Sequence, residues 1–579
     1  MTQRRNRDGS TVAYYALAEN AWNAAAKRAE ARVVHNFGRA DQLDRAALQR
    51  LVNSINRVLS DGEAVTGASK QTPPIAIERV FELGVVLAAR GLWEDLGIGA
   101  AIRRCIAEGG LTAPHEAALF AMAANRLDAP GSKLACAERW LADVAFLPDA
   151  AGLAVDQLYR ALDFLAVWSD RIEHEVFLQA ADLFRLDVDL IFYDTTTAYF
   201  ETDEADEDPE EWGGRLFAPL RRRGHNKEGR DNQPQVIIAL AVTRDGMPVR
   251  SWVLPGDTAD VTTVARIKDD LSAGNRFAVA SLRGIGPKAR WRLGRCVFVG
   301  DAGMYSADNM AALSRGLGRY ILAVPMRKVK EIELEVLSRP GRYKPVADNL
   351  QVKEVVVGEG ERRRRYVLCL NPEEAEKQRL HREQLLSELS IELNLLHERA
   401  DDHPKAACTL LASRRYGRYL ATDYLGRPRL DAAKVKAAEK FDGKFVVITN
   451  DDTLTAEDVP LGYKGGWIIE ACFRRMKQTG LEVRPMFHWT ARRIEAHVRL
   501  CVLALQMQSA AEIRCSLPWS RIAHELAALK AVRYQAGDRT IVQRSKITDS
   551  LGQILKKLGI SIPKQILTVS EPVETAAET

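Results

Sequence analysis

The stretch LDVDLIFYDTTTAYF, residues 186–200, is the part of the sequence that best indicates the fold. Its first nine residues predict a strand that ends at Asp194, because apolar residues dominate them and three threonines follow. The run CVFVGD predicts another strand, which ends at Asp301. Functional sites in α/β sheets are usually built at strand ends. Either aspartate alone would fit a turn or a helix cap. The hypothesis of a functional site therefore rests on the two aspartates together.

The elements around these two strands predict a mixed α/β core. The run PQVIIALAV, from Pro234, and the run MPVRSWVL form a predicted hairpin around an Asp-Gly turn. One helix is expected from about Thr262, another after the capping residue Ser306, and a fifth strand from Arg319. The expected order is a three-stranded meander followed by helix, strand, helix and strand.

Changes in composition divide the chain into six expected regions. The start is polar and partly helical, with an amphipathic helix from Leu43 and a linker from Ser69. Alanine- and leucine-rich helical periodicity follows before the strands begin. The expected regions are an N-terminal region (1–74), a helical domain (75–185), the first part of the core (186–327), a β-rich insertion with one long helix (328–451), the second part of the core (452–515) and a C-terminal region with a loose tail (516–579).

Composition excludes several classes of protein. The 579 residues are 46% hydrophobic and 27% charged, which is ordinary for a globular protein and wrong for a disordered one. No apolar run approaches the ~20 residues of a membrane span, and no apolar core follows the first basic residues as in a secretory signal. The eight cysteines form no C-x-x-C pair, so we expect a cytoplasmic protein. The net charge of +5 averages acidic and basic segments that are separated in sequence, so it is uninformative about nucleic acid.

The segment YKGGWIIEACFRRMKQTGL, residues 463–481, predicts a helix with two different faces. At about 100° per residue, polar and aromatic residues fall in one file and apolar residues fall opposite. The file consists of Tyr463, Trp467, Glu470, Arg474 and Lys477, and the apolar face of Ile468, Ile469, Cys472, Phe473 and Met476. A solvated face with ion pairs at helical spacing would explain the charges, but not an exposed tyrosine and tryptophan.

Asp194, Asp301 and Glu470 would together make a triad of carboxylates. Hard oxygen ligands of this kind suit Mg²⁺ or Mn²⁺ and not zinc. Two such ions about 3.5–4 Å apart activate a water or hydroxyl and stabilise the leaving oxygen of a phosphodiester. This chemistry needs no histidine base, and we expect His488 and His497 to be packed or hydrogen-bonded.

Charged segments after the first aspartate are further candidates. The run ETDEADEDPEE, residues 201–211, holds eight acidic groups, for which we expect a mobile, solvated loop. A basic cluster follows at Arg221, Arg222, Arg223 and Lys227. These four residues are candidates for contacts with DNA phosphates.

The helix segment resembles a signature of the DDE transposases of bacterial insertion sequences. Tyr463, Glu470 and Lys477 fall on the conserved letters of Y-x-x-R-x-x-x-E-x-x-x-x-x-x-K with the right spacing. The arginine position is Gly466, where this sequence departs from the pattern. Arg474, in the same file, is a candidate substitute for the phosphate contact of that arginine.

Other segments strengthen this resemblance. The element order is similar to the RNase H-like fold of the family, and the segments around Asp194 and Asp301 resemble those that carry its first two aspartates. PGDTAD, from Pro255, FHWTARRIEAHVRLCVLAL, from Phe487, and the β-rich insertion also resemble parts of this branch. The likeness covers about residues 185–515.

The resemblance implies a transposase that cuts DNA at the ends of its element and joins the freed 3′-hydroxyls to target DNA. The acidic triad would hold two Mg²⁺ or Mn²⁺ ions. Tyr463 and Lys477 would contact phosphate near the cut, and Trp467 would stack on a displaced base. The implied partners are double-stranded DNA, as terminal inverted repeats and as target, and a second copy of the chain. The resemblance also implies that the N-terminal region (1–74) and the helical domain (75–185) recognise the terminal repeats and help to pair two ends.

Two alternatives stay open on the sequence. One is a two-metal nuclease of the same fold that cuts DNA without joining it. The other is a DNA-binding relic whose triad no longer binds metal. Joined products would exclude the first, and a loss of cleavage in an Asp301→Asn variant that still binds DNA would exclude the second.

Overall fold

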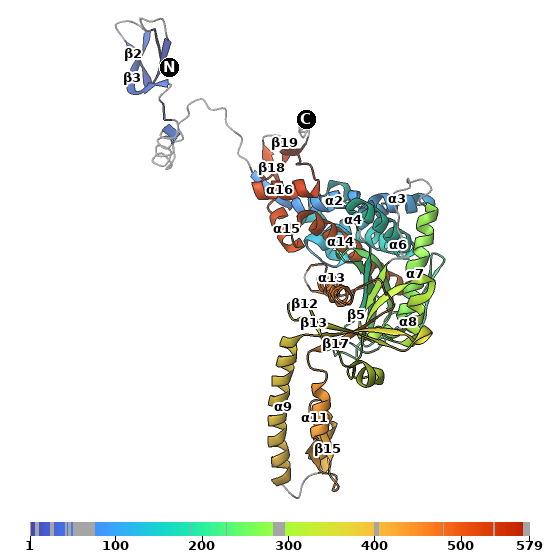
Figure 1. Ribbon diagram of the computed structural model, residues 1–579. Helices are drawn as coiled ribbons and strands as arrows, with labels where there is room; N and C mark the ends of the chain where they lie inside the picture. The colour runs from blue at the N-terminus through green and yellow to red at the C-terminus, as the bar shows by residue number, and fades with distance from the viewer. Residues whose placement is uncertain are drawn as a thin grey trace. The chain divides into compact units, whose positions relative to one another are not determined.

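A computed structural model describes most of the chain, in two compact units, Met1–Ile75 and Ala76–Thr579 (Figure 1). The described residues are 2–5, 11–23, 28–40, 43–44, 48–49, 52, 76–186, 188–226, 229–281, 296–398, 404–478, 480–536 and 539–570. Most of the helix predicted from Leu43, the linker from Ser69 and the loose tail lie outside them. No helix in these ranges is both long and apolar enough to cross a membrane.

The first unit contains an antiparallel three-stranded sheet with the order β1-β2-β3. Its strands are β1 (Thr2–Arg5), β2 (Thr11–Asn23) and β3 (Arg28–Arg39). The helix predicted in this region begins only at Leu43, and the sequence did not predict these strands. β-branched and aromatic residues such as Val12 and Tyr14 favour extended backbone, and the chain around them pairs as a hairpin.

The second unit is built on a nine-stranded sheet with the order β12-β13-β14-β17-β11-β10-β5-β8-β9. Its core strands are β5 (Leu190–Tyr199), β8 (Gln235–Thr243), β9 (Pro248–Pro255), β10 (Val297–Gly300) and β11 (Arg319–Val324). β5, β8 and β9 form an antiparallel meander, and β10 and β11 run parallel to β5. This is the strand order of the RNase H-like fold, as predicted.

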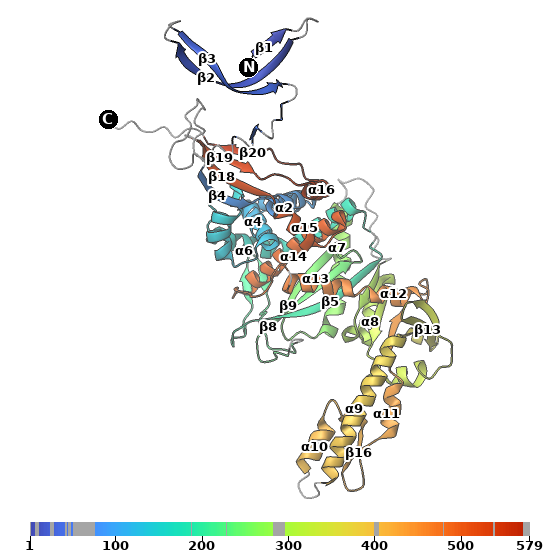
Figure 2. The same cartoon turned by 90° about the vertical axis from the view of Figure 1, so that its left-hand side faces the viewer.

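Helices cover both faces of this sheet (Figures 1 and 2). On one face, α7 (Asp260–Ser281) receives Tyr193, whose hydroxyl lies 2.8 Å from Thr263 Oγ1. Side chains alternate along a strand, so Phe192 and Asp194 point to the opposite face. All nine residues of β8 are buried, as expected for a central strand with both faces covered.

The predicted β-rich insertion joins the core sheet and does not form a sheet of its own. β12 (Lys344–Ala347), β13 (Leu350–Val357), β14 (Arg364–Leu370) and β17 (Lys444–Thr449) extend the core sheet, and β17 pairs antiparallel with β11. The insertion is continuous with the core sheet because β17 forms backbone hydrogen bonds with β14 along one edge and with β11 along the other.

An arm of helices leaves the sheet between β14 and β17 (Figure 1). It contains α9 (Pro372–Glu398), α10 (Pro404–Ala412) and α11 (Ala432–Glu439). Asn371 caps α9, since its Oδ1 accepts from Glu374 N at 3.0 Å. The arm has its own small core, which includes Leu389 and Leu393. At its base, Asn371 N donates to the carbonyl of Gly443 at 2.8 Å.

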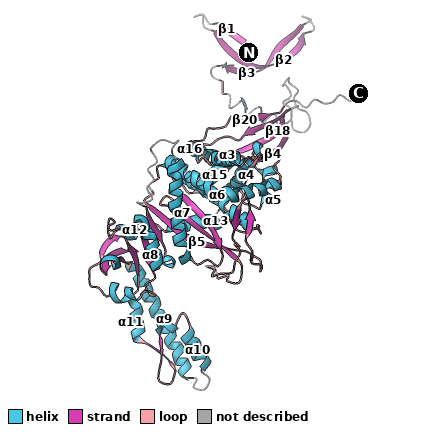
Figure 3. Cartoon of the chain, turned by 90° about the vertical axis from the view of Figure 1, so that its right-hand side faces the viewer, coloured by secondary structure: helices cyan, strands magenta, loops and turns pink. Residues whose placement is uncertain are grey.

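The helical region and the C-terminal region pack together, although the sequence separates them (Figure 3). β4 (Ala76–Glu82) pairs antiparallel with β18 (Lys530–Ala536) in a four-stranded sheet with β19 (Arg539–Arg544) and β20 (Ile566–Val569). The helices of this part are α2 (Gly84–Asp95), α3 (Ile98–Glu108), α4 (His115–Asp128), α6 (Val155–Phe184), α14 (Ala491–Cys515), α15 (Trp519–Leu526) and α16 (Asp549–Leu558).

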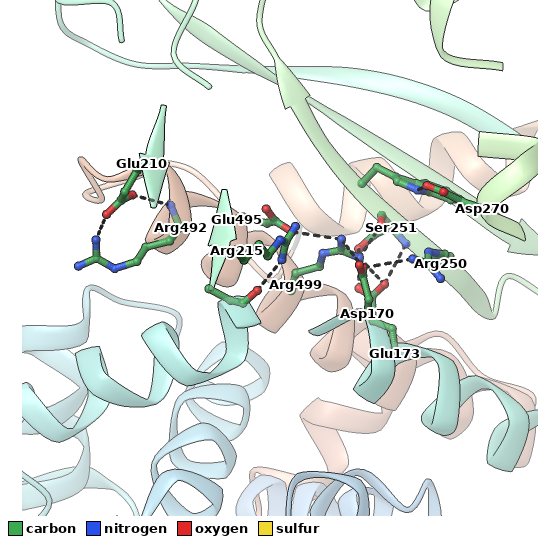
Figure 4. A network of polar contacts seen from close by, with 12 residues as sticks. Asp170, Glu173, Glu210, Arg215, Arg250, Ser251, Asp270, Arg492, Glu495 and Arg499 are labelled. Carbon is green, nitrogen blue, oxygen red and sulfur yellow. Dashed lines mark hydrogen bonds and ion pairs between the residues drawn. The ribbon is translucent and has the colours of Figure 1, made fainter. Parts of the chain in front are cut away.

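A buried ion-pair network joins α6, β9 and α14 (Figure 4). Arg499 of α14 donates to Glu173 of α6 at 2.6 Å, to Asp170 at 3.0 Å and to Glu495 at 3.3 Å. Ser251 of β9 donates to both oxygens of Glu173. Burial raises the pKa of Glu173, and the charge of Arg499 opposes that rise. The network therefore fixes the helical region against the edge of the core sheet.

Candidate active site

Asp194 lies within β5 and not at its end, so the predicted strand end is wrong. The strand continues through the threonines to Tyr199, because β-branched residues favour extended backbone. Asp301 directly follows β10, as predicted. Val299 pairs in register with Phe192, so two further residues along each strand bring Asp301 level with Asp194. Adjacent strands lie about 4.8 Å apart, and the two aspartates occupy neighbouring positions on the sheet.

Backbone N–H groups hold one oxygen of each aspartate. Thr195 N donates to Asp194 Oδ1 at 2.7 Å. Gly303 N donates to Asp301 Oδ1 at 2.9 Å, and this bond caps the short helix η6 (Ala302–Met304). Both aspartates are half-buried, so their carboxylates are anchored to the sheet while remaining open to solvent.

The predicted glutamate helix consists of two helices, α12 (Asp458–Lys464) and α13 (Trp467–Lys477). Gly465 and Gly466 form the turn between them with right-handed backbone angles. A Cβ on Gly465 would lie 2.5 Å from Cζ of Phe192. Only glycine therefore lets this turn approach β5 so closely, two residues before Asp194 in the strand.

The two faces predicted for this helix are confirmed. Ile469, Cys472, Phe473 and Met476 are buried, and Trp467, Glu470 and Arg474 are exposed, whereas Tyr463, Ile468 and Lys477 are half-buried. Trp467 has 66% of its surface exposed. Gly466, at the arginine position of the signature, has 3.2 Å between an added Cβ and its nearest neighbour, Tyr463 O. A side chain at this position would therefore press on a backbone oxygen, and the turn would have to shift by a few tenths of an ångström.

Tyr463 shows that the three candidate carboxylates face one region. Burial contributes most to the raised pKa of Tyr463, and the charges of Asp301, Glu470 and Asp194 follow in that order. Together they raise this pKa to about 12. Three acidic residues from β5, the end of β10 and α13 therefore act on a single hydroxyl, which stays protonated at neutral pH.

The donor chemistry of this region fits a hard divalent cation. Carboxylate oxygens from two strands and a helix are ligands that suit Mg²⁺ and Mn²⁺. Within the described ranges, no three acidic, histidine or cysteine side chains already stand close enough to hold a metal ion. Like charges repel, so we expect bound cations to draw these carboxylates closer together.

The sequence of the chain matches models of two protein-family domains. A model of the transposase DDE domain matches residues 191–507, which is more than half of the chain. The chain belongs to the DDE transposase family. Residues 1–66 also match the N-terminal domain of IS1634 family transposases. It is therefore a metal-dependent, DNA-cleaving transposase.

Solved structures of other transposases have similar parts. The cryo-EM structure of the piggyBac transposase synaptic complex with hairpin DNA is 9% identical over 77% of this chain and 79% of that chain, with a TM-score of 0.33. The Mos1 transposase paired-end complex with the left transposon end is 10% identical over 47% and 66%, with a TM-score of 0.14. The Mos1 mariner paired-end complex with Mn is 8% identical over 48% and 68%, with a TM-score of 0.15. A search of curated proteins found no match.

The transposase has a further acidic residue here that sequence reasoning did not assign. Asp260 opens α7, and its Oδ1 accepts from Thr195 Oγ1 at 2.5 Å. The available signal was the segment PGDTAD, which resembles this transposase branch but has no strand-end position to mark its last aspartate.

The basic cluster of the transposase is held by the acidic run. Arg221 is buried and donates to Asp206 from Nε at 2.7 Å, and its guanidinium lies 5.0 Å from the ring centroid of Trp489. Arg222 and Arg223 donate to backbone carbonyls of the same run. Most of the acidic run is exposed, as expected for a solvated loop, and three of its residues, Asp203, Asp206 and Glu207, accept from these arginines. Lys227 lies outside the described residues.

His488 and His497 are buried, as predicted, and their rings lie 5.1 Å apart. His497 Nδ1 is 2.8 Å from Nζ of the buried Lys133. Burial is the main cause that lowers the pKa of both histidines and lowers that of Lys133 to about 7. These groups pack inside the protein, which agrees with a structural role.

Proposed function

We propose that Asp194, Asp301 and Glu470 are the catalytic acids of this transposase and that they hold two Mg²⁺ or Mn²⁺ ions. The observation that carries this proposal is the level position of Asp194 and Asp301 on adjacent strands. The electrostatic effect of all three carboxylates on Tyr463 supports it. The close approach of Gly465 to Phe192, which sets α13 against β5, supports it further.

The reaction is phosphoryl transfer at the ends of the element. Bound divalent ions would activate the attacking oxygen and stabilise the negative charge on the leaving oxygen. Water would attack the phosphorus and displace the 3′-oxygen of the element end as a 3′-hydroxyl, leaving a 5′-phosphate on the flanking DNA. That hydroxyl would then attack a phosphodiester of the target DNA, form a new P–O bond and displace the 3′-oxygen of the target strand as a hydroxyl. The carboxylates orient this chemistry from the rigid sheet and from α13.

Residues on α12 and α13 would hold the DNA strand beside the acids. The protonated hydroxyl of Tyr463 is a hydrogen-bond donor for a phosphate oxygen, and Lys477 adds a positive charge. Trp467, exposed on the same face, offers a ring on which an unpaired base stacks. Arg474 would replace the signature arginine that Gly466 lacks.

DNA contacts outside this face are also part of the proposal. Arg222 and Arg223 would bind backbone phosphates of the terminal inverted repeat. Arg221 would support them from its buried pair with Asp206, and Lys227 would extend the cluster. Two copies of the chain, each bound to one end of the element, would form the active complex.

A strand-transfer assay tests this function. The full chain is incubated with a labelled, precleaved terminal repeat, a supercoiled plasmid and Mg²⁺, Mn²⁺ or EDTA. We expect joined product with either metal and none with EDTA. Cleavage of an uncut end without joining would favour a nuclease. In parallel, Asp301→Asn should lose both reactions and keep its gel shift with DNA, whereas unchanged DNA processing would indicate that the acids are not catalytic.

A further inference from the structure

Asp260 is bound to the residue that follows the first catalytic aspartate. Its Oδ1 accepts from Thr195 Oγ1 at 2.5 Å, and Thr195 N donates to Asp194 Oδ1 at 2.7 Å. Thr195 is only 2% exposed. Because side chains alternate along β5, Asp260 holds Thr195 from the face of the sheet opposite to Asp194.

The start of α7 is tied to β5 by a second contact. Thr263 Oγ1 donates to the carbonyl of Asp260 at 2.7 Å and lies 2.8 Å from the Tyr193 hydroxyl. Asp260 is therefore fixed one helical turn from the threonine that contacts Tyr193, the residue before Asp194 in β5.

The start of α7 also lies beside the loop of the second catalytic aspartate. A methyl group added to Gly303 would lie 3.2 Å from Asp301 Oδ1 and 3.8 Å from Asp260 Oδ2. Asn309 Nδ2 donates at 2.8 Å to the carbonyls of Val261 and Met304, which joins this loop to the start of α7. One segment therefore contacts the backbone around both Asp194 and Asp301.

We propose that Asp260 is a positioning residue for the metal site, acting through Thr195 on Asp194, while the start of α7 that carries it braces the η6 loop next to Asp301. This inference rests on the proposed function of those two aspartates. Outer residues that orient metal ligands typically change metal affinity by about 10–100-fold when they are removed. The hydrogen bond from Thr195 Oγ1 to Asp260 would fix the backbone N–H of Thr195, which binds Asp194 Oδ1. The Asp194 carboxylate would therefore keep its orientation.

Mn²⁺ binding to the full-length chain without DNA tests this role. Free Mn²⁺ is measured by electron paramagnetic resonance during titration of wild type, Asp260→Ala, Asp260→Asn and Thr195→Val. The asparagine keeps an acceptor for Thr195, and the valine removes the donor while Asp260 keeps its charge. Asp269→Ala, which removes an exposed carboxylate from the same helix, is the matched control. The Mn²⁺ concentration for half-maximal DNA cleavage is measured in the same set.

We expect Asp260→Ala and Thr195→Val to raise the Mn²⁺ concentration for half-saturation of the protein, and that for half-maximal cleavage, about tenfold. Asp260→Asn should raise these two concentrations less. Unchanged Mn²⁺ binding in folded Asp260→Ala and Thr195→Val proteins would overturn the inference, even if their melting temperatures fall. If Asp260→Ala does not fold, Thr195→Val alone decides. Failure of the wild type to bind Mn²⁺ or to cleave DNA would instead overturn the proposed function.

Discussion

The ion-pair network around Arg499 and the carboxylate region around Tyr463 are two charged clusters on the same unit, and they are built differently. Arg499 and Glu173 are 3% and 2% exposed and satisfy each other directly. Asp194 and Asp301 are half-buried, Glu470 is exposed, and backbone N–H groups hold the aspartates. A buried charge needs a permanent internal partner, whereas a site for cations and phosphates has to keep its charges accessible.

This difference separates stability from activity. Loss of one member of the Arg499 network leaves another charge buried without compensation. Neutralising an accessible catalytic acid removes no internal support of that kind. The two clusters should therefore respond in opposite ways when stability and cleavage are measured on the same variants.

The largest expected effect is on catalysis. Asp301→Asn and Glu470→Gln should each lower the cleavage rate about a thousandfold, because metal-held charge stabilisation is worth several kcal/mol. Their melting temperatures should stay close to wild type, since asparagine still accepts from Gly303 N. Asp308→Asn, an exposed acid of α8 (Ala307–Ser314), is the control. Cleavage at the wild-type rate in either variant would contradict the comparison.

Arg499→Met should destabilise the protein by about 3–5 kcal/mol in urea unfolding, because Glu173 is then buried without its main partner. The double variant Arg499→Met with Glu173→Gln should recover most of this loss, since glutamine remains an acceptor for Ser251. A single variant as stable as wild type would show that the network does not hold α14 against α6 and β9.

Gly465→Ala should cost about 1–3 kcal/mol of stability and lower cleavage about a hundredfold through displacement of α13. The added methyl would meet the ring of Phe192 at 2.5 Å. Gly552→Ala is the control, because this glycine of α16 has 3.8 Å between an added Cβ and its nearest neighbour, Cγ2 of Ile547. Equal cleavage rates for the two variants would remove the role given to Gly465.

The smallest expected effect is that of Tyr463→Phe, which should lower cleavage about tenfold through loss of one hydrogen bond to phosphate. The folded pKa of about 12 exceeds the ordinary value of 10.0. Between those values the unfolded chain loses this proton while the folded chain keeps it, so stability falls as pH rises. The phenylalanine variant should lose less stability between pH 10 and 12 in urea unfolding, and an identical loss would contradict this assignment.

Much of the core could be predicted because its signals are local. The strand order follows from apolar runs and turn residues, and the two faces of α13 follow from helical spacing. The end of β5 was predicted wrongly because an aspartate followed by threonines can either end a strand or lie within one. The joining of β17 to β11 depends on non-local pairing, which periodicity does not encode.

The site residues divide in the same way. Asp194, Asp301 and Glu470 are marked by their elements and by their resemblance to a family. Asp260 becomes visible only through its bond to Thr195 across the sheet. Arg221 was predicted from charge alone, and its burial against Asp206 arises from a turn that brings two charged runs together.

The base of the helical arm has a consequence for how the chain varies. Leu370 pairs with Lys444, so the arm departs and returns at a single rung of the ladder. Removal of residues 372–442 would leave Leu370-Asn371-Gly443-Lys444, and Asn-Gly is a preferred two-residue hairpin turn. Gly443 already has a φ of +61°. The arm is thus an exchangeable appendage on a closed hairpin, and evolution or an engineer can lengthen, replace or delete it without redrawing the sheet.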